Sequence, residues 1–159
     1  MRRLLVAYYS RTGNTQKMAE LVAQGAAEVE AVQVDLRPID QVSPNELLNY
    51  EGIVLGSPTY YGNMAAELKQ LLDASVSHHG QLEGKVGAAF ASAGGHGSGG
   101  ETTVLAILQA LLIHGMIIQG SAQGNHYGPV SAGPPDEAAA QECRRLGRQV
   151  AALVVRLFP

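Results

Sequence analysis

The chain has 159 residues, a single cysteine and a formal net charge of −3 at neutral pH. This length is typical of one domain, so we expect residues 1–159 to form a single unit. The weakly acidic balance provides no basic surface for nucleic acid, and no apolar run approaches the roughly 18 residues of a membrane span. Cys143 has no partner for an internal disulfide, which favours a reducing compartment. We therefore expect a cytoplasmic protein that binds neither nucleic acid nor membranes.

Short apolar runs and helical repeats alternate along the whole chain. Apolar runs bounded by turn residues predict five strands, at Leu4–Tyr9, Val32–Leu36, Ile53–Leu55, Val86–Ala91 and Met116–Ile118. Apolar residues at helical spacing, together with the capping box Ser43–Glu46, predict helices that begin near Thr15, Pro44, Met64, Thr102 and Pro134. The helix over 102–113 is apolar on nearly every side, so we expect it to be well buried.

This alternation predicts an α/β fold with a doubly wound, five-stranded parallel sheet and helices on both faces. A strand order of 2-1-3-4-5 fits five such units, although the pattern itself does not determine the order. Ligands of these sheets bind beyond the carboxyl ends of the strands, at the switch point. Three loops follow strands there: Ser10–Thr15, Ser57–Asn63 and Ser92–Glu101.

The first loop combines hydroxyl groups, a glycine and an amide, in the order Ser10, Arg11, Thr12, Gly13, Asn14 and Thr15. It precedes a predicted helix, whose first backbone amides and dipole favour an anion. Gly13 permits close approach of the backbone. The loop lacks the G-K-[ST] ending of a nucleotide P-loop. A phosphate site is one interpretation, and ordinary helix capping is the other.

The second loop contains two adjacent aromatic residues, in the order Pro58, Thr59, Tyr60, Tyr61, Gly62 and Asn63. Tyrosines at a ligand-binding edge can lie against a planar ring, and Gly62 allows the backbone to reorient. The same residues also fit a simple turn whose tyrosines cover the core.

The third loop is rich in small residues and begins Ser92, Ala93, Gly94, Gly95, His96 and Gly97. Residues 95–100 match G-x-G-x-x-G, but the acid that a dinucleotide site expects near the end of the next strand is replaced by Gln119 and Gly120. We interpret this loop as flexible backbone around the edge of a flat ligand. His96 is the candidate for a contact on the substrate side.

The three loops together resemble those of the flavodoxin-like FMN proteins, and the resemblance covers essentially the whole chain. The stretch S-R-T-G-N-T is similar to their phosphate loop. G-S-P-T-Y-Y-G-N-M, from Gly56 to Met64, and H-G-M, from His114 to Met116, resemble the WrbA-type NAD(P)H:quinone oxidoreductases. The resemblance implies that residues 10–15 bind the FMN phosphate, and that residues 58–63 and 92–97 hold the isoalloxazine ring. Thr12 and Ile113 depart from the aromatic and the second histidine that those enzymes often carry.

The expected activity is a two-electron reaction in which NAD(P)H reduces FMN and a quinone then reoxidises it. The flavin performs this chemistry, so no catalytic side chain is required. The alternatives are a flavodoxin-type carrier of single electrons between proteins and a flavin-binding protein without catalysis. No residue spacing indicates a metal site. His114 is interpreted as a core or helix-end residue in preference to a flavin contact, and the resemblance implies a homo-oligomer, either a dimer or a tetramer.

Overall fold

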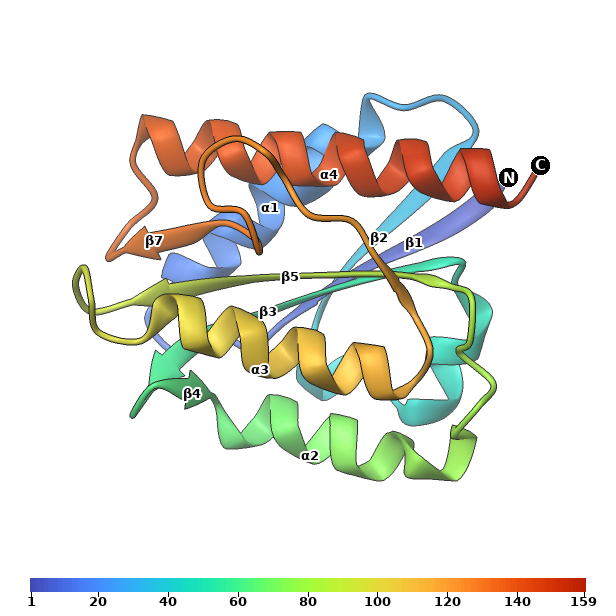
Figure 1. Ribbon diagram of the computed structural model, residues 1–159, viewed down its shortest axis with the longest axis horizontal. Helices are drawn as coiled ribbons and strands as arrows, with labels where there is room; N and C mark the ends of the chain where they lie inside the picture. Colours follow the sequence, from blue (N-terminus) through green and yellow to red (C-terminus); the bar gives the residue numbers. More distant parts are fainter.

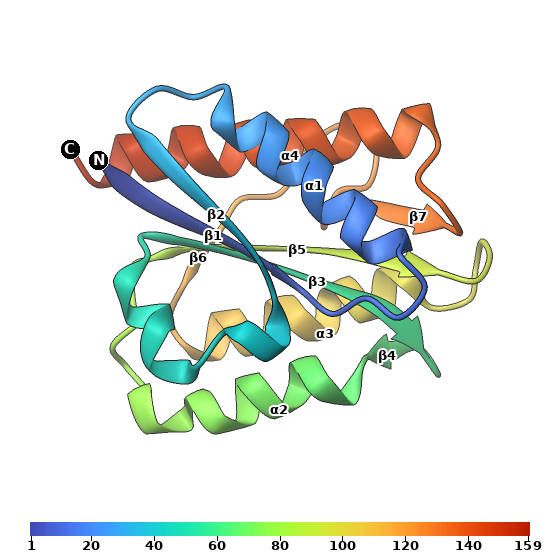
Figure 2. The same ribbon diagram turned by 180° about the vertical axis from the view of Figure 1, so that it is seen from behind.

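The structure, a computed structural model, describes residues 1–159 and contains one sheet whose main strands run parallel. The order along the sheet is β2-β1-β3-β5-β6, as Figures 1 and 2 show. These strands span Val32–Pro38, Arg2–Tyr8, Gly52–Tyr60, Val86–Ala93 and Ile117–Ile118, respectively. Counted along the chain, they have the predicted order 2-1-3-4-5. The parallel doubly wound fold is therefore confirmed.

Four α-helices cover the two faces of the sheet. Figure 1 shows α1 (Asn14–Ala27) and α4 (Glu137–Leu157) on one face, and α2 (Ala66–Ala74) and α3 (Gly100–Ile113) on the other. Short 3-10 helices follow β2 and α2, with the bounds η1 Ile39–Gln41, η2 Pro44–Asn49 and η3 Ser75–His78. None of the helices combines the length and the apolar character that crossing a bilayer requires.

The middle parts of β1, β3 and β5 are continuous runs without polar residues because both faces are buried there. Side chains alternate along β1, so Leu4 and Val6 pack with α1 and α4, whereas Leu5 and Ala7 pack toward α2 and α3. The same alternation divides β5. Continuous apolar runs thus supply two separate cores, one on each side of the sheet.

Two strand features differ from the prediction. The residues after β3 continue into a hairpin, in which β4 (Asn63–Met64) pairs antiparallel with the end of β3. The fifth strand is split: β6 pairs with the start of β5, and β7 (Val130–Ala132) pairs with its end. Residues 119–129 leave the sheet between these two short strands.

The prediction that helix 102–113 is well buried is wrong at its carboxyl end. Leu112 and Ile113 are 56% and 73% exposed. One stripe of α3, including Val104 and Ile107, packs on the sheet, and no further layer covers the opposite side. An apolar sequence sets the capacity of a helix to be buried, but the neighbouring layers determine how much of it is covered.

Helices α1 and α4 pack with their backbones in direct contact. A Cβ added to Gly25 would overlap the carbonyl oxygen of Arg144, and one added to Gly147 would overlap that of Val22. Glycine inside a helix costs about 1 kcal/mol relative to alanine. Here that cost is offset because the two glycines allow a close helix crossing.

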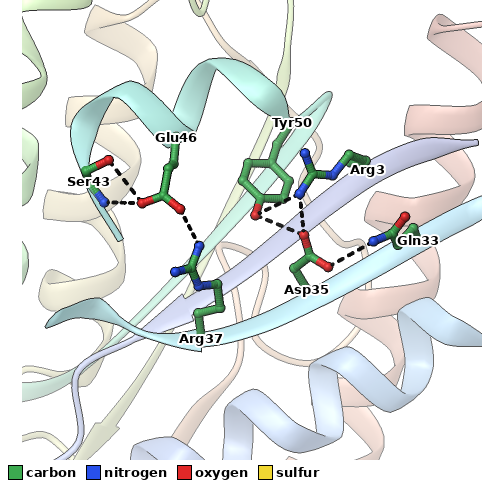
Figure 3. A network of polar contacts seen from close by, with 7 residues as sticks. All are labelled: Arg3, Gln33, Asp35, Arg37, Ser43, Glu46 and Tyr50. Carbon is green, nitrogen blue, oxygen red and sulfur yellow. Dashed lines mark hydrogen bonds and ion pairs between the residues drawn. The ribbon is translucent and has the colours of Figure 1, made fainter. Parts of the chain in front are cut away.

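A polar network joins η2 to strands β1 and β2, as Figure 3 shows. Arg3 donates to Asp35 at 2.8 Å, and the Tyr50 hydroxyl donates to the same carboxylate at 2.9 Å. The Arg3 guanidinium also lies 4.6 Å from the centre of the Tyr50 ring. Burial opposes ionisation of Asp35, but hydrogen bonds from Arg3 and Tyr50 outweigh it and lower its pKa. The network therefore joins β1, β2 and η2 through one carboxylate.

The predicted capping box at η2 is confirmed, and its glutamate also pairs with an arginine of β2. Glu46 accepts hydrogen bonds from the backbone amide of Ser43 at 2.8 Å and from its hydroxyl at 3.0 Å. Arg37 of β2 contacts the other oxygen of Glu46 at 2.5 Å. The Ser43 amide is the main cause that lowers the pKa of Glu46 to about 2, and Arg37 adds to it.

We expect Gly147→Ala to destabilise the protein by about 1–3 kcal/mol through overpacking against α1. Helix propensity alone predicts the opposite sign, a gain of up to about 1 kcal/mol. Urea unfolding of the variant and the wild type measures the difference. The matched control is Ala152→Gly at an exposed position of α4, where only the propensity loss is expected. A stability equal to or above that of the wild type would contradict the described packing.

We expect Glu46→Gln to lower the melting temperature at pH 7 by about 2–4 °C, since solvent screening at this partly exposed site keeps the effect small. The folded protein holds the pKa of Glu46 at about 2, below the reference value of 4.5. Its contribution is therefore present above pH 4.5 and is lost as the pH falls toward 2. Thermal melts of both proteins at pH 7 and pH 3 test this, with exposed Glu30→Gln as the control. A difference that does not shrink at pH 3 contradicts the assignment.

Candidate functional site

The three loops singled out in the sequence lie together at one edge of the sheet. They follow β1, β3 and β5, which are parallel neighbours, so their carboxyl ends point the same way. Figure 1 shows the β3–β4 hairpin and the loop between β5 and α3 side by side at this edge, and Figure 2 shows the loop into α1 there as well. The fold thus gathers into one surface the first and third loops, whose nearest residues along the chain, Thr15 and Ser92, are 77 positions apart.

The first loop presents unpaired amides at the start of α1. Gly13 precedes the helix with a φ of 103°, and its amide donates to the Ser10 hydroxyl at 3.2 Å. The first helical hydrogen bond runs from Lys17 to the Gly13 carbonyl, so the amides of Asn14, Thr15 and Gln16 have no helical partner. No acidic residue lies in this first turn. The arrangement suits an anion.

Thr15 joins the first loop to the third. Its side chain is buried, and its hydroxyl lies 2.8 Å from that of Ser92. Arg11, Thr12 and Gly13, by contrast, are exposed at the surface of the loop. The three hydroxyls predicted as one group therefore have different roles. Thr15 holds two loops together, Ser10 accepts from the Gly13 amide, and Thr12 faces solvent.

The second loop forms the tight turn of the β3–β4 hairpin. Tyr60 pairs with Asn63, and the two residues between them, Tyr61 and Gly62, both have left-handed backbones, with φ of 49° and 76°. Glycine adopts this conformation freely, but a bulky aromatic residue there is an outlier. The Tyr61 side chain is fully exposed and Tyr60 is 37% exposed. These tyrosines do not cover the core, so the loop carries an accessible aromatic surface.

Backbone contact joins the second loop to the third. A Cβ on Gly99 would lie 2.6 Å from the Cα of Gly62, so only glycine fits at this φ of 102°. Thr102, in the first turn of α3, donates to the carbonyls of Gly62 and Gly99 at 2.7 and 2.9 Å. Sequence reasoning missed this contact, because a threonine at a helix start gives no signal of a partner 40 residues away.

The third loop borders open space with its backbone. A Cβ at Gly94, Gly95 or Gly97 would meet no atom within 4 Å. Ser98 stabilises the loop internally through hydrogen bonds with the amide and carbonyl of Gly95. A cavity of about 340 Å³ lies here, bordered by His96 and Asn125, and His96 is exposed. A flat ligand can therefore approach the loop without meeting large side chains.

One buried hydroxyl in these loops has no hydrogen-bond partner. The Oγ1 atom of Thr59 is enclosed and has no hydrogen-bond partner within the protein. Buried polar groups nearly always have a partner. The exposed aromatic turn, the unpaired amides and this hydroxyl together fit a ligand that has a phosphate and a flat ring, as FMN has.

The histidine of the H-G-M motif lies elsewhere. His114 follows the last turn of α3, at the opposite edge of the sheet from the three loops. It is buried, and its Nε2 lies 2.7 Å from the Ser75 hydroxyl. Burial, assisted by His79, lowers the pKa of His114, which favours a neutral ring at pH 7. Its position agrees with the core and helix-end interpretation.

Neither Cys143 nor His126 lines the cavity beside the third loop. Cys143 is buried in α4, and burial raises the pKa of its thiol to about 12, so it is no nucleophile at neutral pH. His126 is exposed in the segment between β6 and β7, where its Nδ1 lies 2.8 Å from the Ser121 carbonyl. No three His, Cys, Asp or Glu side chains gather in a way that would hold a metal ion.

The fold and the loops define a flavodoxin-like FMN protein, and comparisons with known proteins agree. Residues 3–126 match the family model described as NADPH-dependent FMN reductase. The chain is 40% identical over 95% of its length to a flavodoxin of Aquifex aeolicus, covering 86% of that protein. It is 35% identical over 99% of its length to an NAD(P)H dehydrogenase (quinone) of Archaeoglobus fulgidus, covering all of that protein. The chain belongs to the NADPH-dependent FMN reductase family of FMN-binding oxidoreductases.

Solved structures give the same result. A flavodoxin from the domain Archaea superposes with a TM-score of 0.80 at 28% identity, over 98% of this chain and 99% of that one. A flavodoxin, WrbA-like protein from Agrobacterium tumefaciens superposes with a TM-score of 0.82 at 23% identity, over 98% of this chain and 99% of that one, which supports the fold.

Proposed function

We propose that this protein is a cytoplasmic, FMN-dependent oxidoreductase that transfers two electrons from NAD(P)H to a quinone or a similar small acceptor. Bound FMN would supply the redox chemistry, in which the hydride of NAD(P)H and one proton from solvent together reduce a quinone to its quinol. The relative from Archaeoglobus fulgidus, named NAD(P)H dehydrogenase (quinone), supports this reaction. The protein's task is to bind the cofactor, orient it and leave one face accessible.

Each loop has a distinct part in this proposal. Residues 10–15 hold the phosphate, mainly through the unpaired amides at the start of α1. Residues 58–63 place an aromatic surface against the ring. Residues 92–97 follow the edge of the ring with backbone groups. Because the loop contains no lysine, the phosphate is bound mainly by neutral amides and hydroxyls, with the exposed Arg11 as the one cation of the loop.

The open third loop is the observation that carries the choice of a small-molecule reaction. Its glycines border open space, and His96 is its largest side chain. A planar substrate can therefore stack on the ring beside this loop. His96 is placed to contact such a substrate, since it is exposed and borders the adjacent cavity.

The second candidate is a flavodoxin-type carrier of single electrons. Relatives named flavodoxin in Aquifex aeolicus and, at 33% identity, in Clostridium saccharobutylicum favour it. The exposed Tyr60 and Tyr61 would suit contact with a protein partner equally well. Assembly into a dimer or tetramer, as the resemblance implies, would favour the enzyme by closing the site around a small substrate.

We expect Asn14→Asp to weaken FMN binding by about tenfold or more, because a carboxylate at the start of α1 repels the phosphate. The same change stabilises the FMN-free protein slightly, since an acid in the first turn of a helix is favourable. Quenching of flavin fluorescence measures the affinity, and thermal melts measure the stability. Gln24→Glu, exposed near the other end of α1, is the control. Unchanged FMN affinity in Asn14→Asp would contradict the assignment of the phosphate to residues 10–15.

The reaction itself is tested by adding NADH or NADPH to the FMN-loaded protein without oxygen. We expect the flavin band near ~450 nm, a property of the cofactor, to bleach directly and to return when a quinone is added. A flavin that binds but stays oxidised with both nucleotides would refute the enzyme and favour the carrier, which needs a separate reductase. Free FMN with the same nucleotides provides the background rate.

A further inference from the structure

A large cavity of the protein lies outside the three loops. It has a volume of about 700 Å³ and lies beyond the carboxyl ends of β1 and β2, between η1 and α2. Figure 2 shows η1 and η2 above α2 on this side of the molecule. The cavity shares only Ser10 with the three loops. A volume of this size is within the range of small-molecule sites.

The walls of the cavity are apolar and aromatic. Tyr8 and Tyr9 lie at the end of β1, Ile39 and Val42 come from the segment after β2, and Leu71 comes from α2. These side chains are held by their packing in the cores, and all but Tyr9 are buried. The site is therefore formed in advance and can accept a ring by stacking and apolar contact.

Tyr8 is the most enclosed polar residue of this wall. The residue as a whole is 8% exposed, and it lines the cavity. Burial raises the pKa of Tyr8, with the carboxylates of Glu20 and Asp40 adding to the shift, so its hydroxyl keeps its proton. A protonated hydroxyl at the wall can bond a ligand that enters the cavity.

The charges that border the cavity have one sign. Asp40 of η1 and Glu67 of α2 line it from opposite sides, and no lysine or arginine lies among its lining residues. Neither carboxylate forms an ion pair in the structure. Beyond the lining, Glu20 adds a negative charge near Tyr8, and Arg11 lies near Tyr9 as an opposing positive charge. The carboxylates outnumber this cation, so the field in the cavity disfavours anions such as NAD(P)H and attracts cations.

We propose that this cavity is a second ligand site, which binds a small organic cation with a planar ring, such as an aromatic amine. The ring lies among Tyr9, Ile39 and Leu71, and the ammonium group lies between Asp40 and Glu67. The proposal goes beyond the oxidoreductase function and does not depend on it. The cavity leaves residues 58–63 and 92–97 free and shares only Ser10 with the loop at residues 10–15, so the proposal includes binding of the cation together with FMN.

The test compares tryptamine with indole-3-propionate, which have the same ring on a short chain but opposite charge. Each is titrated into the ¹⁵N-labelled, FMN-loaded full chain at pH 7, and amide chemical shifts are followed. We expect tryptamine to shift residues 38–44 and 67–74 in a saturable manner. Indole-3-propionate is expected to bind about tenfold more weakly or worse, because the two carboxylates repel it. Equal affinity for the two probes, or shifts centred elsewhere, would overturn the proposal.

Two variants separate the cavity from a general surface effect. Asp40→Asn/Glu67→Gln is expected to weaken tryptamine about tenfold and to bring the two probes close to equal affinity. Ala74→Trp, at an exposed lining position of α2, places an indole in part of the cavity and should weaken tryptamine binding about tenfold or more. Glu30→Gln, which removes one exposed carboxylate between α1 and β2, is the control for a general loss of surface charge. Tryptamine binding that survives both cavity variants refutes the site, whatever the protein does with FMN or NAD(P)H.

Discussion

The contact between two backbones at Gly62 and Gly99 is the constraint on which the candidate site depends. It lets the β3–β4 hairpin rest on the first turn of α3, where Thr102 bonds the carbonyls of both glycines. The Thr15–Ser92 hydrogen bond fixes the third loop to the start of α1 in the same way. The three loops that follow β1, β3 and β5 thus form one surface. Because folding already orders these loops, binding of a ligand does not carry that entropic cost.

Sequence patterns were sufficient to predict the fold because the burial of a strand or helix face determines where its apolar residues lie along the chain. The central strands are buried on both faces, which produces the continuous apolar run at Leu4–Tyr8, and the capping box before η2 is local chemistry. The sequence pattern predicts that β3 ends before Ser57, because the polar and aromatic residues from Ser57 to Tyr60 are typical of a loop. In the structure they continue the strand into a hairpin, where partners on β4, not their own polarity, keep them extended.

The parts of the site that escaped prediction are those set by distant neighbours. Thr102 meets Gly62 across 40 residues, and Thr15 meets Ser92 across 77. Neither pairing has a periodic signal in the chain. The same limit explains Leu112 and Ile113, because apolar character reports that a side chain tolerates burial and says nothing of whether a layer is there to cover it. The cavity beside Tyr8 is also a property of how η1 and α2 are spaced, which no pattern records.

Charge is distributed so that the candidate site is nearly free of it. The ion pairs lie on the β2 edge and on the helix surfaces, and none involves residues of the three loops, where Arg11 and Glu101 are the only charged side chains. In the proposed site, amides and hydroxyls at the start of α1 would bind the anionic phosphate through fixed dipoles that need no counter-ion to be moved. A flat ring beside them would lie in a field set by backbone groups. Such a site tunes a cofactor by hydrogen bonding and leaves its open face to the substrate, which is the arrangement expected of an oxidoreductase whose side chains perform no chemistry themselves.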